Sequence, residues 1–370
     1  MHQNHCCHNW SWNVSYLFMN HDSWRVLRDV GILAAKTLYD AEIRDFLILE
    51  ASDRIGGRIH KTQFGGYTVE LGANWAYDGG PMSSPSWTIA KQLKLKSCFS
   101  DFRNLSSNVY KQGGGLYPKL EADAALKSSE AMFNLVVNLS KTLSSKVGKE
   151  EDISILASQR LYKKVPKTPL EMVLDYFLYD YEDAEPPRLT SLKNAIPRNE
   201  FEDFGDNQHF LADPRGFESI VHHIAKGFLS HKLQIIQDSR LKLNKNLENE
   251  LPGSNILYVT ITDEESRRIE QQSDKETEVE IMEVLRKLFG ENIPKPESLL
   301  VPRWFSNKFF KGCFSNWPAG YTENRYEKLK EPVGPIYFTG EHTNAKYLGC
   351  TDGAYLAGIE TANDLIRKLH

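Results

Sequence analysis

Apolar side chains recur every three or four residues through much of this chain, which is the spacing of one face of an α-helix. Near the start, Ile32, Ala35 and Leu38 fall on one such face. The pattern predicts helices over residues 31–41, 120–147, 169–179, 273–289 and from Asp352 or Gly353 to Leu369. Most of the region 81–200 has the same periodicity, so helices dominate the middle of the chain.

The segment 273–289 has the clearest helix boundaries. Ser273 and Glu276 form a capping box, in which each side chain accepts a hydrogen bond from the other residue's backbone N–H, and Gly290 ends the helix. The apolar positions of this helix are Ile281, Val284, Leu285 and Leu288. We interpret this stripe as the face that packs on the protein core.

Short apolar or alternating runs predict β-strands at residues 46–50, 67–70, 234–243, 256–262 and 336–338. Residues 1–22 have neither periodicity and are unusually rich in Asn, His and Trp. We expect this first stretch to be unstructured or foreign to the fold.

The composition is that of a soluble globular protein of about two domains, with 370 residues, 41% of them hydrophobic and 25% charged. The net charge of −4 gives no case for a nucleic-acid partner or for an anionic membrane surface. No window has the long apolar run of a transmembrane helix. The first twenty residues lack the basic and apolar regions of a signal peptide, so the default expectation is a cytoplasmic location.

The five cysteines are odd in number and scattered, which is not a disulfide framework. Cys6 and Cys7 lie near His2, His5 and His8, a composition that invites a metal-site interpretation. The spacing matches no zinc site. We therefore favour an unstructured terminus and predict no metal.

The most informative segment begins with the apolar run 46–49 and ends on Glu50. A short strand that ends on an acid is typical of the second strand of a dinucleotide-binding βαβ unit, where the acid binds the ribose hydroxyls. The turn Gly56-Gly57-Arg58 follows and suits close approach to a pyrophosphate. The upstream glycine-rich loop is absent. Aligning Gly31 with its third glycine puts Val26 and Arg28 at the first two.

Five segments carry a resemblance to a known family: residues 47–58, 70–75, 338–343, 181–188 and 314–318. The first three resemble the flavin-containing amine oxidases, and the other two narrow the resemblance to the plant polyamine oxidases. This resemblance implies FAD as the cofactor and an α/β fold, with an FAD-binding Rossmann-like, doubly wound domain and a second α+β substrate domain. The implied FAD domain comprises residues 23–80, 205–247 and 330–370, and the substrate domain residues 81–204 and 248–329.

The resemblance also assigns cofactor-binding residues. They are Gly31, Glu50, Gly57, Arg58, Gly72, Ala73, Asn74, Trp75, Trp304, Gly340, Glu341 and Thr351. In this assignment Glu341 binds the ribitol chain of the flavin. The helix that begins near Thr351 directs its N–H groups at the pyrimidine ring, where the positive helix end stabilises the reduced, anionic flavin.

The implied substrates are polyamines such as spermine and spermidine, together with dioxygen. A polycation needs carboxylates and aromatic walls, and the implied substrate-binding residues are Glu182, Tyr181 and Phe314. Three positions depart from the family pattern. Asp183 stands in place of an aromatic residue, Tyr77 in place of a second acid and Cys350 in place of a tyrosine. Asp78 follows one place after the position of the missing acid.

An internal gap is the largest departure from the family. Residues 241–245 match the strand before the family's central segment, whereas Asn246 onward matches sequence well beyond it. The skipped part normally carries sheet strands, adenine contacts and the active-site lysine, so we assign no catalytic residue.

The expected activity is oxidation of a secondary amine of a polyamine, with release of hydrogen peroxide. The main alternative is a catalytically inactive, truncated paralogue that acts through protein contacts. A nicotinamide reductase fits less well, because it would depend more strongly on the absent glycine loop. The plant enzymes that the chain resembles are secreted proteins, which competes with the cytoplasmic default. The sequence leaves the oligomeric state open.

Overall fold

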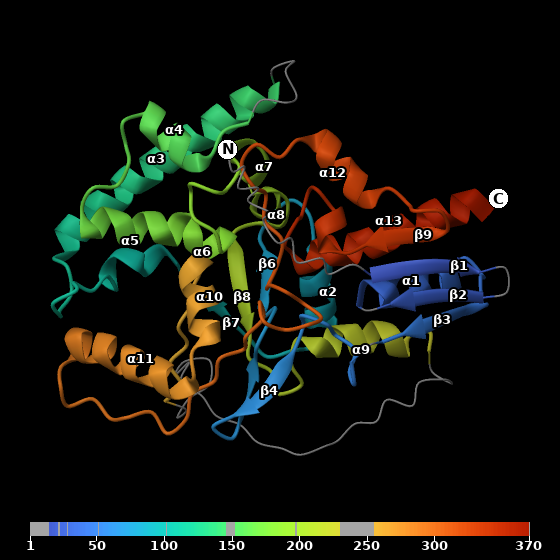
Figure 1. The fold of residues 1–370 in the computed structure, drawn as a ribbon, viewed down its shortest axis with the longest axis horizontal. Helices are drawn as coiled ribbons and strands as arrows, with labels where there is room; N and C mark the ends of the chain where they lie inside the picture. The colour runs from blue at the N-terminus through green and yellow to red at the C-terminus, as the bar shows by residue number, and fades with distance from the viewer. Residues whose placement is uncertain are drawn as a thin grey trace, which may run out of the picture.

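The two ends of the chain lie side by side in the computed structural model, which describes residues 15–20, 23–27, 29–50, 52–100, 102–145, 152–196, 198–229 and 255–369. Figure 1 shows the blue N-terminal strands and the red C-terminal helix together on one side of the molecule, and the green helices of the middle of the chain on the other.

A four-stranded sheet joins the two ends. Its order is β3-β2-β1-β9, with β1 at Ser15–Asn20, β2 at Ser23–Leu27, β3 at Phe46–Leu49 and β9 at Ile336–Thr339. Strands β2 and β3 are parallel and are connected by helix α1 (Asp29–Asp40), which confirms the predicted βαβ unit. Strand β1 is antiparallel to both β2 and β9. Strands β2, β3 and β9 therefore run in one direction, and their carboxyl ends lie at one edge.

One expectation about this sheet needs correction. Residues 15–20 were expected to be unstructured, yet they form β1, whose backbone pairs with a strand on each side. The sheet is consequently mixed, with β1 antiparallel to its neighbours. The pairing explains why the prediction for residues 15–20 was wrong. Strand β1 is stabilised by β9, which lies more than 300 residues away in sequence, and local sequence patterns do not indicate such a distant partner.

Helices α1 and α13 (Thr351–Leu369) pack closely over the sheet. A Cβ atom added at Gly358 of α13 would lie 2.7 Å from the carbonyl oxygen of Val30, so the small residue permits the close approach. Leu38 and Leu365 are fully buried between these helices and Tyr337 of β9. The main core lies beside them, where α1 meets α2 (Pro85–Gln92) and α9 (Glu218–Lys226).

A three-stranded antiparallel sheet forms the middle of the molecule. Its order is β6 (Trp75–Asp78), β8 (Asn207–Leu211) and β7 (Ser97–Ser100). A separate hairpin pairs β4 (Lys61–Phe64) with β5 (Tyr67–Glu70). The predicted strand 67–70 is thus confirmed.

Helices α3 (Lys119–Ser145), α4 (Ile155–Leu161), α5 (Pro169–Leu178), α10 (Asp263–Gln271) and α11 (Asp274–Phe289) form the side of the molecule away from the chain ends (Figure 1). Helix α12 (Glu323–Lys330) lies beside β9. The other short elements are α6 (Asp180–Asp183), α7 (Leu192–Ala195), α8 (Asn199–Phe204) and a 3₁₀ turn at Phe102–Ser107. Val136 and Ile155 are fully buried where α3 meets α4. All the predicted helices are present, with boundaries shifted by at most two residues.

Two predictions from periodicity fail. In α11 the predicted capping box is present, but the predicted buried face is only partly correct. Val284 is 55% exposed, whereas Met282 is buried. The reason is that α11 lies at the surface, where only part of its apolar stripe packs against other residues. Residues 256–262 form no strand in the part of the chain that the structure describes. The strand predicted at 234–243 lies outside the described residues.

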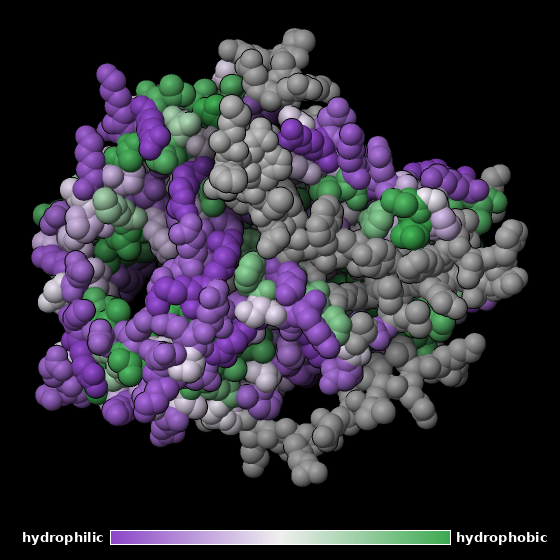
Figure 2. All heavy atoms as spheres, viewed as in Figure 1, coloured by the Kyte–Doolittle hydropathy of each residue, from purple (hydrophilic) through white to green (hydrophobic). Residues whose placement is uncertain are grey.

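The surface drawn in Figure 2 is mainly hydrophilic, with hydrophobic side chains in small separate groups. Within the described ranges, no helix is long and apolar enough to cross a membrane. No cluster of three or more metal-ligating side chains occurs in the same part of the chain.

Candidate active site

Glu50 stands directly after β3, at the edge where the parallel strands end. Its Oε1 accepts hydrogen bonds from the backbone N–H and the hydroxyl of Ser52, both at 2.8 Å. Its Oε2 is buried and has no hydrogen-bond partner among the described residues. A buried, unpaired carboxylate oxygen is costly unless a ligand supplies a donor, and a ribose hydroxyl is such a donor.

The turn that follows is shaped by its glycines. Gly56 has a φ of +115°, and a Cβ atom there would lie 2.6 Å from the carbonyl oxygen of Ile59. The Arg54 guanidinium donates to the carbonyl oxygens of Gly57 and Ile59 and holds the turn closed. Arg58 follows this closed turn, and its side chain contacts residues of the C-terminal part of the chain.

Arg58 and Glu341 form an ion pair between segments 283 residues apart. Arg58 Nη2 lies 2.9 Å from Glu341 Oε1, and Nη1 donates to the carbonyl oxygen of Cys313 at 2.8 Å. Glu341 also accepts from the Ser315 hydroxyl at 2.9 Å and from the Gly349 N–H at 2.8 Å. Burial alone would raise the pKa of Glu341, but Arg58 and the other donors outweigh it and hold that pKa below its usual range.

His342 follows Glu341 in a 3₁₀ turn and is also buried. Neither of its ring nitrogens has a hydrogen-bond partner within the described ranges. Burial lowers the pKa of His342, which favours the neutral imidazole. The turn itself is closed by Gly340, whose N–H donates to the Thr343 hydroxyl at 3.2 Å. The sequence motif did not single out His342.

The Gly72 segment lies against the Arg58 backbone. A Cβ atom at Gly72 would fall 1.7 Å from the Arg58 carbonyl oxygen, so only glycine fits there. Ala73 N–H donates to the same oxygen at 3.3 Å. The Trp304 indole donates to the carbonyl oxygen of Leu71 at 2.8 Å. The structure thus places Gly72, Ala73 and Trp304 around the segment of Arg58, which pairs with Glu341, and their contact with FAD stays a prediction.

Two predicted cofactor residues have structural roles that are visible here. Asn74 is buried and its backbone carbonyl accepts from Leu211 N–H at 2.9 Å, which extends the ladder of β6 and β8. The Trp75 ring packs edge-to-face on Phe210, with ring centroids 5.1 Å apart. Contact of either residue with FAD stays a prediction.

The start of α13 is anchored by Asp352. This buried carboxylate accepts from the Ser84 hydroxyl and from Ser86 N–H, both at 2.8 Å. Gly353 lies so close to Tyr347 that a Cβ atom would fall 2.0 Å from the Tyr347 carbonyl oxygen. The first residue, Thr351, is therefore held in place at the helix N-terminus. Sequence reasoning named Asp352 only as a helix start and missed its anchoring bonds.

The predicted pyrophosphate turn is short. Strand β2 ends at Leu27 and α1 begins at Asp29, with Gly31 in its first turn. Val26 lies within β2, in register with Ile48, rather than in the turn. Arg28 lies outside the described residues. The backbone here has no glycine between strand and helix.

On the predicted substrate side, Glu182 lies in α6, next to a residue that forms an ion pair. Asp183 Oδ2 is 2.9 Å from Arg198 Nη2, and both side chains are buried. Arg198 also donates to the carbonyl oxygen of Leu178 at 3.1 Å. Burial raises the pKa of Glu182, although Arg198 opposes the rise. Arg198 thus compensates the negative charge of Asp183, a residue that departs from the family pattern.

The two predicted aromatic residues flank this region differently. Tyr181 stacks on Phe177, with centroids 5.4 Å apart and planes 16° apart. Phe314 is 40% exposed and lies beside Gly349, the residue whose N–H binds Glu341. Phe314 therefore contacts the segment that binds Glu341, which is on the predicted flavin side.

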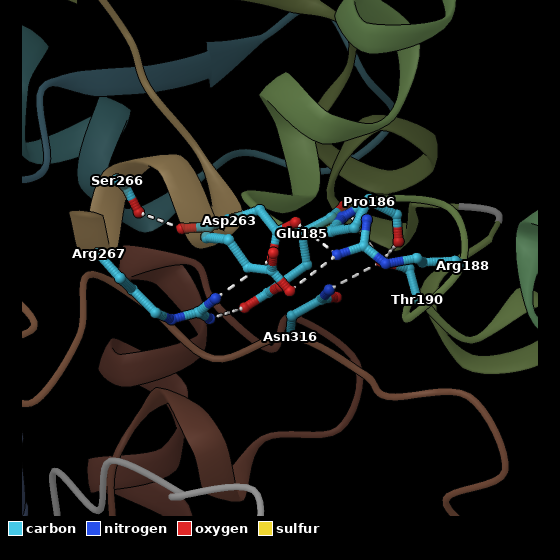
Figure 3. Close-up of polar contacts among 9 residues, drawn as sticks. Glu185, Pro186, Arg188, Thr190, Asp263, Ser266, Arg267 and Asn316 are labelled. Carbon is cyan, nitrogen blue, oxygen red and sulfur yellow. Dashed lines mark hydrogen bonds and ion pairs between the residues drawn. The ribbon is translucent and has the colours of Figure 1, made fainter. Parts of the chain in front are cut away.

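The loop after Glu182 is fastened by a network of charges that Figure 3 shows. Arg188 Nη2 lies 2.8 Å from Asp263 Oδ2, and Arg267 binds both Glu185 and Asp263. Asn316 donates to the Thr190 hydroxyl at 3.1 Å. The network joins α10 and the segment around Asn316 to the loop and so fixes the position of α6.

Within the described residues, the groups that fit FAD are the unpaired oxygen of Glu50, the close backbone approach at Gly72 and the fixed start of α13. A βαβ unit ending in a carboxylate, with a second acid after a strand of the same sheet, is the arrangement of a dinucleotide-binding oxidoreductase, and the groups above fit FAD.

The comparisons with known proteins specify this class. The flavin containing amine oxidoreductase family matches residues 31–249 and 246–366, and the chain belongs to that family. It is similar to polyamine oxidase 1 of Zea mays, 39% identical over 91% of this chain and 88% of the relative. Polyamine oxidase 6 of Oryza sativa subsp. japonica is also 39% identical, with the same coverage.

Solved structures support the fold. A putrescine oxidase with bound putrescine has a TM-score of 0.64 and 15% identity, and the match covers 93% of this chain and all of that one. The FAD cofactor and the amine oxidase class are thereby established for this chain.

The internal gap predicted near Asn246 is supported by the same comparisons. The two matched segments of the family meet at residues 246–249. The alignment with the maize relative extends over 443 positions, more than the 370 residues of this chain, so the relative has positions with no counterpart here.

Proposed function

We propose that this protein oxidises a secondary amine of a polyamine such as spermine or spermidine, with dioxygen as the electron acceptor. The observation that carries the proposal is the half-buried carboxylate of Glu182, which has no ion-pair partner among the described residues. A polycation would compensate this charge. The names of the relatives, which are polyamine oxidases, support the same substrate class.

In this proposal each group of cofactor-binding residues contacts a different part of the FAD molecule. Glu50 binds the ribose, Gly57 and Arg58 lie toward the pyrophosphate, and the 72–75 turn with Trp304 faces the flavin. Glu341 binds the ribitol, and the N-terminus of α13 at Thr351 stabilises the pyrimidine ring. When bound, FAD takes up a hydride equivalent from the amine and passes electrons to dioxygen to give hydrogen peroxide. We retain the proposed division into an FAD domain built from both chain ends and a substrate domain.

The same proposal predicts weak FAD binding and slow turnover. The β2–α1 turn lacks the glycines that allow backbone N–H groups to reach phosphate oxygens. Each lost charge-assisted hydrogen bond costs roughly 1.5–3 kcal/mol, so a few such losses lower the affinity by orders of magnitude. The family's active-site lysine falls in the internal gap.

The test is to express residues 1–370, add FAD and follow flavin fluorescence quenching together with peroxide release in the presence of spermine. We expect weak quenching and slow, spermine-dependent peroxide release. Sub-micromolar FAD binding with fast turnover would contradict the predicted weakness. FAD binding without any amine-dependent peroxide would contradict the polyamine oxidase proposal.

A second candidate is an inactive relative that acts through protein contacts. The observation that favours it is the missing glycine turn together with the internal gap. The colour of the purified protein discriminates the two, because a protein that retains flavin is yellow. A colourless, monodisperse protein that takes up no FAD would favour this candidate.

A further inference from the structure

Two carboxylates from different helices lie on the proposed substrate side, and neither is in an ion pair among the described residues. Glu182 lies in α6 and Glu200 in α8. Arg198 precedes α8, but its guanidinium is committed to Asp183 and to the Leu178 carbonyl oxygen. Among the described residues, neither Glu182 nor Glu200 has an ion pair with a positively charged side chain. Glu182 and Glu200 are both half-buried.

The position of α8 is fixed by contacts with the end of β6. Gly80 N–H donates to the Phe204 carbonyl oxygen at 2.8 Å, and Met82 N–H donates to the Asp203 carbonyl oxygen at 2.8 Å. Gly205 has a φ of +96°, and a Cβ atom there would lie 2.3 Å from Gly80 N, so the two backbones can meet only without a side chain. Helix α8 is therefore a rigid support for its side chains.

This contact sets α8, the helix that carries Glu200, against Tyr77, the position where the sequence lacks an acid. The ion pair of Asp183 with Arg198 at 2.9 Å ties the Glu182 segment to the start of the same helix. The ring of Tyr77 in β6 packs edge-to-face on Phe201, the neighbour of Glu200, with centroids 5.5 Å apart. Burial raises the pKa of Tyr77, and the nearby carboxylates of Glu200 and Glu182 add to the rise. Asp78 does not replace the acid, since successive strand residues face opposite sides and Asp78 lies 4.0 Å from His209.

We propose that Glu200 is a second substrate-binding carboxylate, which binds an ammonium group of the polyamine together with Glu182. The proposal rests on the proposed function and adds a residue from α8 to it. A dication or longer polyamine then finds two negative charges, whereas a monoamine can use only one at a time. Glu200 is thus a determinant of the preference for polyamines over monoamines.

The charge state of Glu200 makes this binding depend on pH. Burial raises the pKa of Glu200 to about 7, with Arg198 opposing and Glu182 and Asp183 adding to the rise. Tyr77 and Cys350 face it from β6 and from the start of α13. The ionised carboxylate binds a cation, so spermine binding should strengthen as pH rises from 6 to 8.

The experiment measures spermine binding to the full-length protein with FAD, by calorimetry at low salt, for the wild type, Glu200→Gln and Glu182→Gln. Glu202→Gln is the matched control, because Glu202 lies in the same helix but is exposed and paired with Lys141 at 3.0 Å. We expect Glu200→Gln to weaken spermine binding about tenfold at pH 8 and to reduce its pH dependence. Butylamine binding should change much less, and Glu202→Gln should match the wild type.

Other outcomes overturn the proposal in distinguishable ways. Unchanged spermine binding in Glu200→Gln, with weaker binding in Glu182→Gln, removes Glu200 and leaves the polyamine site intact. Absence of spermine binding by the wild type overturns the proposal and the proposed function together. The melting temperature without ligand should not fall in Glu200→Gln, because the substitution removes a charge that burial disfavours; a large fall would instead assign Glu200 a structural role.

Discussion

At the scale of single residues, the ion pair between Arg58 and Glu341 connects the two ends of the chain. Arg58→Ala would leave Glu341 buried without its cation, which typically costs about 3–5 kcal/mol. We expect a loss of this size in the free energy of unfolding, measured with urea.

The matched control for this prediction is Lys141→Ala. It breaks an exposed pair with Glu202, which contributes about 0–1 kcal/mol. Equal losses in the two variants would show that the Arg58 pair is no more important than a surface contact. Arg58→Lys keeps the positive charge and should lie between the two.

At the scale of elements, Glu70 links β5 to the start of α9. Its Oε1 accepts from Phe217 N–H at 2.7 Å, while its Oε2 is buried without a partner among the described residues. Burial raises the pKa of Glu70 to about 7, despite the opposing hydrogen bond from Phe217. The folded protein therefore holds a proton that the unfolded chain releases near pH 4.5, and the stability from this group is lost as pH rises through 7.

We expect Glu70→Gln to be nearly neutral at pH 5 and to stabilise the protein at pH 8 by up to about 3 kcal/mol, since glutamine keeps an acceptor for Phe217. Unfolding in urea at both pH values measures this difference. Glu42→Gln changes an exposed acid and serves as the control. The same gain at pH 5 and pH 8 would show that Glu70 is already ionised at both.

At the scale of the whole molecule, FAD should stabilise the fold because its predicted contacts come from both chain ends. A ligand at 100 times its Kd adds about 2.7 kcal/mol, so the melting temperature should rise with FAD concentration. Glu50→Gln should weaken this rise, because the carboxylate loses its charge toward the ribose hydroxyls. An FAD-dependent rise that is identical in the wild type and Glu50→Gln would remove Glu50 from the cofactor site.

The sequence predicted the elements whose signals are local. The acid after β3 and the Ser273 capping box were read correctly because they depend on residues only a few positions apart. The α11 stripe failed at Val284, since burial depends on what lies opposite a helix and periodicity contains no such information. The strand predicted at 256–262 is also absent from the described residues, since alternation along a segment is a local signal and strand pairing is not.

The sequence by itself determined the family, the cofactor, the βαβ unit around Glu50 and the internal gap, because motifs and periodicity record local constraints on backbone and chemistry. Only the tertiary structure decided which distant residues meet. It placed β1 between β2 and β9, joined Arg58 to Glu341 and set α8 against Tyr77. These contacts arise from packing and pairing across hundreds of residues, where the free energy depends on the whole arrangement rather than on any one segment.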